Sequence, residues 1–179
     1  MAANLIATRG LADTKIEDLA EATGIPKATL YYYFSGKEEI LVFLLRDYLA
    51  LVAGAVDIAA ESEGSAAVRL GAVVRAQLDV LAEAPSVALA LISDLGRATR
   101  MPELADALVS AYYAPVERLL REGAEDGSLR AVDDPAATSM AIFGAATVVG
   151  LHQLMAGTPL DAAPLATEVT AFVLHGVSA

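Results

Sequence analysis

The stretch IEDLAEATGIPKATLYYYFSGKEE, residues 16–39, decides the fold. Its first apolar residues recur at the i, i+3 and i+4 positions of a helix: Ile16, Leu19 and Ala20. Just before them, Thr14 and Glu17 have the T-x-x-E spacing of a capping box, which predicts a helix start near Lys15. Gly24 ends this short helix.

A second short helix follows after a four-residue turn. Pro26 favours its start, because proline tolerates the first helical turn, and we expect it to run to about Phe34. Ser35 with Glu38 gives another capping box, which predicts a long helix over residues 36–60. A helix, a turn with glycine and a short helix form the helix-turn-helix, whose second helix can enter a DNA major groove.

Three consecutive tyrosines lie in that second helix. With Leu30 and Phe34 as the inward pair, about 100° per residue predicts an outward face of Ala28, Thr29 and Tyr32, flanked by Tyr31 and Tyr33. Phenols on this face offer hydroxyls to phosphates and rings to thymine methyls. The alternative is that the tyrosines are partly buried core, and that the nearby lysines are ordinary solvated side chains.

Composition bounds what else the chain can be. It has 179 residues, 56 % of them hydrophobic, which predicts a folded chain with a large core and an interface or an apolar cavity. There are no cysteines, so disulfides and thiolate metal sites are excluded. The longest apolar run, near 140–151, is shorter than a bilayer span, and we expect a cytoplasmic protein with no membrane segment.

The net charge of −11 argues against a nucleic-acid partner when taken alone. All three lysines, however, fall within the first 37 residues: Lys15, Lys27 and Lys37. Because salt screens charges beyond about 8 Å, a local basic surface can act although the rest of the chain is acidic. That surface must be small, since acids still outnumber bases in the first 50 residues.

The stretch LIATRGLADTKIEDLAEATGIPKATLYYYFSGKEEIL, residues 5–41, resembles the DNA-binding domain of the tetracycline-repressor-like (TetR) family. The resemblance implies DNA contacts at Lys15, Lys27, Ala28, Thr29, Tyr31, Tyr32, Tyr33 and Lys37. Family members usually begin with a basic arm and a fuller first helix than Met1-Ala2-Ala3 allows. Either the start has been trimmed or the arm is absent, in which case DNA affinity falls.

Beyond residue 50 the apolar patterns keep the helical period, and none has the sustained alternation of a strand. Glycine and proline breaks predict helices near 65–83, 86–99, 103–126, 135–156 and 162–176. We therefore expect an all-α fold of about nine helices, the number that the family implies. A three-helix headpiece at 1–45 would bind DNA, and a helical bundle at 46–179 would bind an effector and dimerise.

The last two predicted helices carry candidate interface faces. One is a small-residue face of Ala137, Ala141, Gly144, Ala145 and Val148, and the other is an apolar stripe of Leu165, Val169, Phe172 and Val173. A single bundle could bury both faces, but the family resemblance favours a homodimer through these helices.

The middle helices carry a candidate effector pocket, in which apolar walls mix with occasional polar groups. Its residues are Gln77, Leu81, Ile92, Asp94, Arg97, Tyr112, Tyr113, Phe143, Thr147 and His152. Tyr112 and Tyr113 could equally be core, and His152 could be a structural residue near a helix end. Few charges occur in the middle of these helices, so an apolar or amphipathic ligand is expected.

Catalysis is not expected, because the chain has only two histidines and no hydrolase or phosphate-loop motif. No catalytic residue, metal site or cofactor is predicted. The sequence thus indicates a homodimeric, ligand-responsive transcriptional regulator, most simply a repressor that a small molecule releases from a palindromic double-stranded DNA operator. The alternative is a helical ligand-binding or scaffolding dimer that has lost DNA binding with its N-terminal arm.

Overall fold

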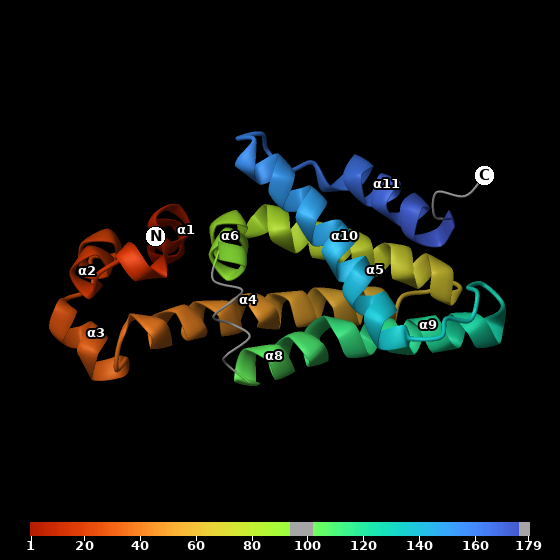
Figure 1. The fold of residues 1–179 in the computed structure, drawn as a ribbon, viewed down its shortest axis with the longest axis horizontal. Coiled ribbons are helices and arrows are strands. Elements are labelled where there is room, and N and C mark those ends of the chain that lie inside the picture. The colour runs from red at the N-terminus through yellow and green to blue at the C-terminus, as the bar shows by residue number, and fades with distance from the viewer. Residues whose placement is uncertain (94–101, 176–179) are drawn as a thin grey trace. The chain divides into compact units, whose positions relative to one another are not determined.

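The computed structural model describes residues 1–93 and 102–175, and all regular structure within these ranges is helical (Figure 1). Its elements are α1 (Ala2–Asp13), α2 (Ile16–Thr23), α3 (Lys27–Tyr33), α4 (Lys37–Ala60), α5 (Ala66–Glu83), α6 (Pro85–Ser93), α8 (Pro102–Leu108), η1 (Val109–Tyr113), α9 (Ala114–Asp126), α10 (Pro135–Met155) and α11 (Ala162–His175). Counting α8, η1 and α9 as one continuous helix, the described residues form nine helices. The all-α prediction is confirmed. The predicted end of the helix at 86–99 lies outside the described residues.

The chain divides into two compact units. Met1–Leu49 and Ala84–Ala107 form the first, and Ala50–Glu83 and Leu108–Ala179 form the second. The helix α4 therefore begins in one unit and ends in the other. These units are defined by packing and do not test the predicted boundary near residue 45 between DNA binding and effector binding. That boundary stays a prediction.

The first unit is held by a small apolar core. The helix α1 packs on α6 and on α2, and α2 packs on α3. The large side chains that are almost fully buried there are Ile6, Leu11, Leu19, Leu41 and Leu45. Burial of each side chain contributes about 1.5–3 kcal/mol to the stability of the fold, so this small unit can hold a fixed shape.

The turn between α2 and α3 is fixed by backbone conformation. Gly24 has a φ of 71°, in the left-handed region that glycine adopts without strain, and ends α2 as expected. The helix caps differ from the two predicted boxes by one residue. The Lys15 N–H donates to the Asp18 carboxylate at 2.9 Å, while the Thr14 hydroxyl donates to the Gly10 carbonyl at 2.7 Å.

The second box is shifted in the same direction. The backbone N–H and hydroxyl of Ser35 donate to the carboxylate of Glu39, at 2.7 and 2.8 Å, and not to Glu38. These two hydrogen bonds lower the pKa of Glu39 below its usual range. Both predicted capping pairs are therefore wrong, although the helices begin close to where they were expected.

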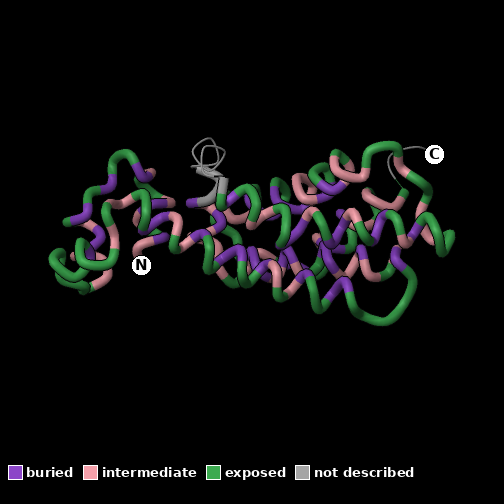
Figure 2. Tube along the Cα trace, turned by 90° about the horizontal axis from the view of Figure 1, so that it is seen from below, coloured by how far each residue is buried: buried purple, intermediate pink, exposed green. Residues whose placement is uncertain are grey.

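The second unit is built around α5, which packs against α9, α10 and α11. Its core includes Val56, Leu70, Val73, Val74, Leu78, Tyr112 and Leu119, and Figure 2 shows buried positions recurring along its helices. The helices α5 and α10 approach closely at Gly150 of α10. A Cβ placed there would lie 2.2 Å from Leu81 Cδ2, so a larger residue would require the Leu81 side chain to move.

The predicted helix at 103–126 contains a π-helical turn. At η1 the chain winds wider, and the Ala114 N–H donates to the Val109 carbonyl five residues back. Pro115, in the first turn of α9, has no N–H to continue the α-helical ladder. The wider turn lets the chain pass the proline without a break.

The helix α10 is long and apolar enough to cross a bilayer by length and composition. Core helices of soluble bundles pass the same test, and α10 packs against α5, α9 and α11. Its hydropathy is therefore weak support for a membrane span.

Candidate DNA-binding surface and ligand cavity

The outward face of α3 is formed as the helical period predicts. Leu30 is buried at 5 % exposure, whereas Tyr32 is 80 % exposed and its two tyrosine neighbours are also exposed. The rings of Tyr32 and Tyr33 meet edge to face, with centroids 5.0 Å apart. The alternative of a buried tyrosine cluster is therefore wrong, and α3 presents three phenols, Ala28 and Thr29 to solvent.

The lysine at the start of α3 is not free. The Lys27 amino group forms an ion pair with the Glu17 carboxylate of α2, and it lies 5.6 Å from the centroid of the Tyr31 ring. This hydrogen-bonded pair lowers the pKa of Glu17 and raises the pKa of Lys27. Both groups therefore stay charged at neutral pH, and the positive charge at this edge of α3 is partly neutralised.

The other two predicted lysines lie near each other. The Lys37 amino group donates hydrogen bonds to the carbonyls of Ala12 and Thr14, at 2.8 and 2.9 Å. Thr14 is joined directly to Lys15, whose side chain is exposed at the start of α2. Lys37 thus ties α4 to the end of α1 and places its amino group next to the backbone that leads into Lys15.

Five of the predicted effector residues meet inside the second unit. The Gln77 side-chain amide donates to the Phe143 carbonyl at 3.0 Å and to the Thr147 hydroxyl at 2.7 Å. The Phe143 ring packs edge to face on Tyr112 and Tyr113, with centroids 5.0 and 5.6 Å away. We call these five residues the Gln77 cluster.

Two polar atoms of the Gln77 cluster are buried without a hydrogen-bond partner among the described residues: Gln77 Oε1 and the Tyr112 hydroxyl. Burial raises the pKa of Tyr112, which is fully buried, and that of Tyr113, which is half-buried. Both phenols are therefore neutral. A buried polar atom left unpaired costs about 1–3 kcal/mol, which a suitable ligand group could recover.

The remaining predicted effector residues do not all join this cluster. Leu81 lies one turn beyond Gln77 on α5 and faces Gly150, while the His152 side chain is exposed. Asp94 and Arg97, and the side chain of Ile92, lie outside the described residues.

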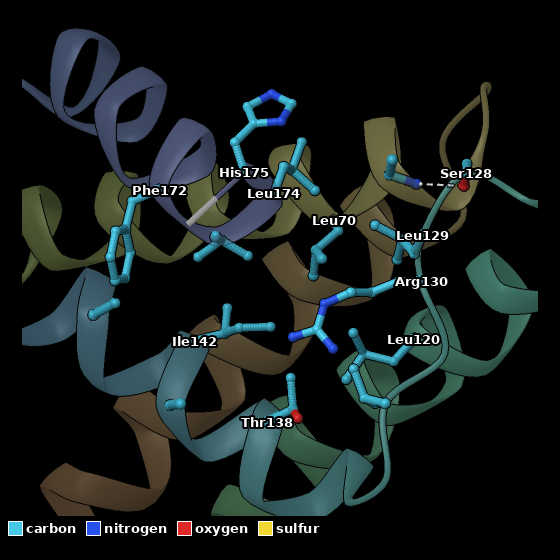
Figure 3. Close-up of a pocket in the computed structure, with 15 residues that line it drawn as sticks. Leu70, Leu120, Ser128, Leu129, Arg130, Thr138, Ile142, Phe172, Leu174 and His175 are labelled. Carbon is cyan, nitrogen blue, oxygen red and sulfur yellow. Dashed lines mark hydrogen bonds between the residues drawn. The ribbon is translucent and has the colours of Figure 1, made fainter. Parts of the chain in front are cut away.

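A cavity of about 580 Å³ lies elsewhere in the second unit, among α5, α9, α10, α11 and the loop before α10. None of the ten predicted effector residues lines it. Figure 3 shows the Arg130 guanidinium directed into the space beside Thr138 and Ile142, with apolar side chains around it. Sequence reasoning missed Arg130, because a single arginine in a loop carries no periodic signal.

The last two long helices also expose apolar side chains. On α10 these are Met140, Val148, Val149 and Met155, and on α11 Phe172 is 53 % exposed. The predicted small-residue face of α10 shares this surface, with Ala137 and Ala141 exposed and Gly144 and Ala145 half-buried. Val169, predicted to be on the apolar stripe of α11, is instead buried at 5 % exposure in a helix that packs on α5.

An exposed recognition-type helix on a helix-turn-helix, attached to a helical bundle, defines a DNA-binding transcriptional regulator. Residues 1–42 match the family described as "Bacterial regulatory proteins, tetR family", and residues 63–177 match "Tetracyclin repressor-like, C-terminal domain". The chain belongs to the TetR family. Members are transcriptional regulators rather than enzymes, which confirms the prediction from the residues.

Similar proteins cover almost the whole chain. The HTH-type transcriptional repressor KstR2 of Mycolicibacterium smegmatis is 25 % identical, over 99 % of this chain and 87 % of its own. A Clostridium perfringens putative fatty acid metabolism regulator has a TM-score of 0.87 at 24 % identity, covering 99 % of this chain and 96 % of its own. Bacillus subtilis FadR, solved with stearoyl-CoA, has a TM-score of 0.83 at 20 % identity, covering 99 % and 96 %. At this identity the two solved structures establish the fold alone.

Proposed function

We propose that this protein is a homodimeric, ligand-responsive repressor, with DNA binding in residues 1–45 and effector binding and dimerisation in residues 46–179. The observation that carries the proposal is the outward face of α3, where Ala28, Thr29 and three tyrosines are exposed while Leu30 is buried. A contiguous group of exposed aromatic side chains is typical of an interaction site, and a major groove offers phenols both phosphates and thymine methyls.

Within this proposal the DNA contacts have separate roles. Thr29 and Tyr32 read base edges, Ala28 lets the helix approach the groove, and Tyr31 and Tyr33 bind the flanking backbone. Lys15, Lys27 and Lys37 bind phosphates, Lys27 after exchanging its Glu17 partner for DNA.

The homodimer forms through the exposed face of α10 and α11. Small residues let two helices approach closely, and the exposed Val148, Met155 and Phe172 gain by leaving water. A two-fold axis would set two copies of α3 about 34–36 Å apart, so the operator is palindromic.

The effector is a small apolar or amphipathic molecule held by the second unit. Its support is the Gln77 cluster, where the unpaired Gln77 Oε1 accepts a hydrogen bond and the Tyr112 hydroxyl donates one. Bacillus subtilis FadR, which has the same fold, holds stearoyl-CoA in its solved structure. Binding releases DNA because the ligand prefers one of two headpiece arrangements. The protein acts in the cytoplasm, without a membrane partner.

The test is a fluorescence-anisotropy titration of labelled DNA from upstream of the protein's own gene, with a scrambled duplex as the control, at two salt concentrations. Tight, salt-dependent and sequence-selective binding is expected. Weak binding that is equal for both duplexes would contradict the proposal.

The second candidate is a helical ligand-binding or scaffolding dimer without DNA binding. One observation favours it: the amino groups of Lys27 and Lys37 are already engaged, by Glu17 and by backbone carbonyls. Equal and weak binding to both duplexes, together with a stable dimer, would support this candidate.

A further inference from the structure

We propose that the cavity around Arg130 is a second ligand site, separate from the Gln77 cluster, and that it binds an amphipathic carboxylate. A volume of about 580 Å³ lies within the range of small-molecule sites, and it is far larger than the space of a single buried water.

The walls of the cavity suit an apolar tail. They come from four helices and one loop, and include Leu70, Leu120, Ile142 and Phe172. Leu70 and Ile142 are themselves buried, at 1 % and 4 % exposure, so the floor of the cavity is held in place by the core. A tail lying on this floor would gain about 0.8 kcal/mol for each methylene removed from water.

The charge at the cavity suits an anionic head. Arg130 projects into it, and no described residue that lines it is acidic, although the chain carries 23 acidic residues. Most described arginines are paired with a carboxylate, including Arg46, Arg69, Arg75 and Arg118. An arginine fork that faces an apolar cavity is ready to bind a carboxylate through two parallel hydrogen bonds.

The other polar side chains at the cavity are less suited than Arg130 to bind a carboxylate. The Thr138 hydroxyl donates its hydrogen to the Asp134 carbonyl, at 2.8 Å, and Ser128 accepts from the Ala67 N–H at 3.2 Å. The imidazole of His175 lies at the rim and points away from the guanidinium (Figure 3). Arg130 is therefore the strong donor of the site.

The test measures ligand binding without DNA, so it does not depend on the repressor proposal. Three ligands are titrated into the full chain by isothermal calorimetry. Decanoate has a carboxylate and an alkyl tail, decanol has the tail without a charge, and acetate has the carboxylate without a tail. Decanoate is expected to bind most tightly, decanol more weakly, and acetate not at all.

Variants then locate the site. Arg130→Met is expected to lower decanoate affinity about tenfold to a hundredfold and to leave decanol unchanged, because it removes one charge-assisted contact. Arg130→Lys keeps the positive charge but loses the planar guanidinium. Its decanoate affinity should fall between those of wild type and Arg130→Met. Ala67→Leu fills the cavity from α5 and should lower the affinity for both ligands.

Arg121→Met is the matched control, because the Arg121 side chain donates to the Glu117 carbonyl and does not line this cavity. Unchanged decanoate binding in both Arg130→Met and Ala67→Leu would place the ligand elsewhere and overturn the proposal. No binding of decanoate or decanol to the wild-type chain would also overturn it, while leaving the repressor proposal untouched. Thermal melting of each variant confirms that it folds.

Discussion

The carboxylate of Glu17 is paired with the amino group of Lys27, so an acid of α2 holds the first residue of α3. If Lys27 binds a phosphate as proposed, this pair must open or be shared. In that proposal Glu17 competes with DNA for Lys27 while it joins α2 to α3.

Glu17→Gln is expected to raise DNA affinity several-fold and to steepen the salt dependence by about one unit of slope, because Lys27 becomes free to bind a phosphate. The measurement is the anisotropy titration at several salt concentrations. Glu21→Gln is the control, since it removes the same charge from an exposed position of α2. An equal gain in both variants would mean that net charge, and not the release of Lys27, is responsible.

Lys37→Met is expected to have two effects. It removes the hydrogen bonds to the carbonyls of Ala12 and Thr14, which should lower the free energy of unfolding by about 1–2 kcal/mol. It should also weaken binding to all DNA sequences and flatten the salt slope. Urea denaturation measures the first effect and anisotropy the second. Lost stability with an unchanged salt slope would leave Lys37 a structural residue only.

Val148→Glu is expected to convert the proposed dimer to a monomer with its helical content intact, since it would bury a charge in the proposed interface of α10 and α11. Sedimentation equilibrium and circular dichroism measure this. Ile58→Glu provides the comparison, because Ile58 is also exposed, at 78 %, and lies on α4. Dissociation by both substitutions, or by neither, would argue against the proposed interface.

Gly150→Ala is expected to lower the free energy of unfolding by about 1–3 kcal/mol, because Leu81 must move away from the added methyl group. Gly54→Ala tests helix propensity alone, since nothing lies within 4 Å of its added Cβ in α4. This control should be neutral or more stable by up to about 1 kcal/mol. Similar stabilities of the two variants would disprove the close contact between α5 and α10.

Asp126 makes the stability of the fold depend on pH. Its carboxylate accepts from the Ser128 and Ala66 N–H groups, at 2.8 and 3.0 Å, and contacts with Ser128 are the main cause of its lowered pKa. A lowered folded-state pKa contributes stability that is complete above the ordinary value of 3.8 and is lost as pH falls through the lower folded value.

The melting temperature of wild type should therefore exceed that of Asp126→Asn at neutral pH. The difference should shrink below pH 3.8, the ordinary value for this carboxyl. A difference that stays constant across this range would assign the effect to packing rather than to charge.

Local signals carried most of what the sequence could predict. Gly24, Pro26 and the spacing of apolar residues placed α2 and α3, because those signals act within one or two helical turns. The capping pairs were wrong because the neighbouring acids Asp18 and Glu39 offer equivalent oxygens one residue later, and the motif does not choose between them.

Features formed by residues far apart in the sequence were not predicted. The cavity depends on the loop before α10 bringing Arg130 against α5 and α11, and no spacing along the chain encodes this approach. The π-helical turn was not predicted either, although Pro115, which has no N–H to continue the α-helical ladder, is a local signal for it. The Gln77 cluster brings together five of the ten predicted effector residues, but the hydrogen bonds that join them were not predicted.

The tyrosines of α3 also determine what light the protein emits. The chain has no tryptophan and six tyrosines, and three of these six are the exposed phenols of α3. The others are Tyr48 and Tyr112, which are buried, and Tyr113, which is half-buried. Because half of its fluorophores lie on the helix proposed to enter the groove, the unlabelled protein's own ultraviolet emission should change whenever that helix becomes occupied.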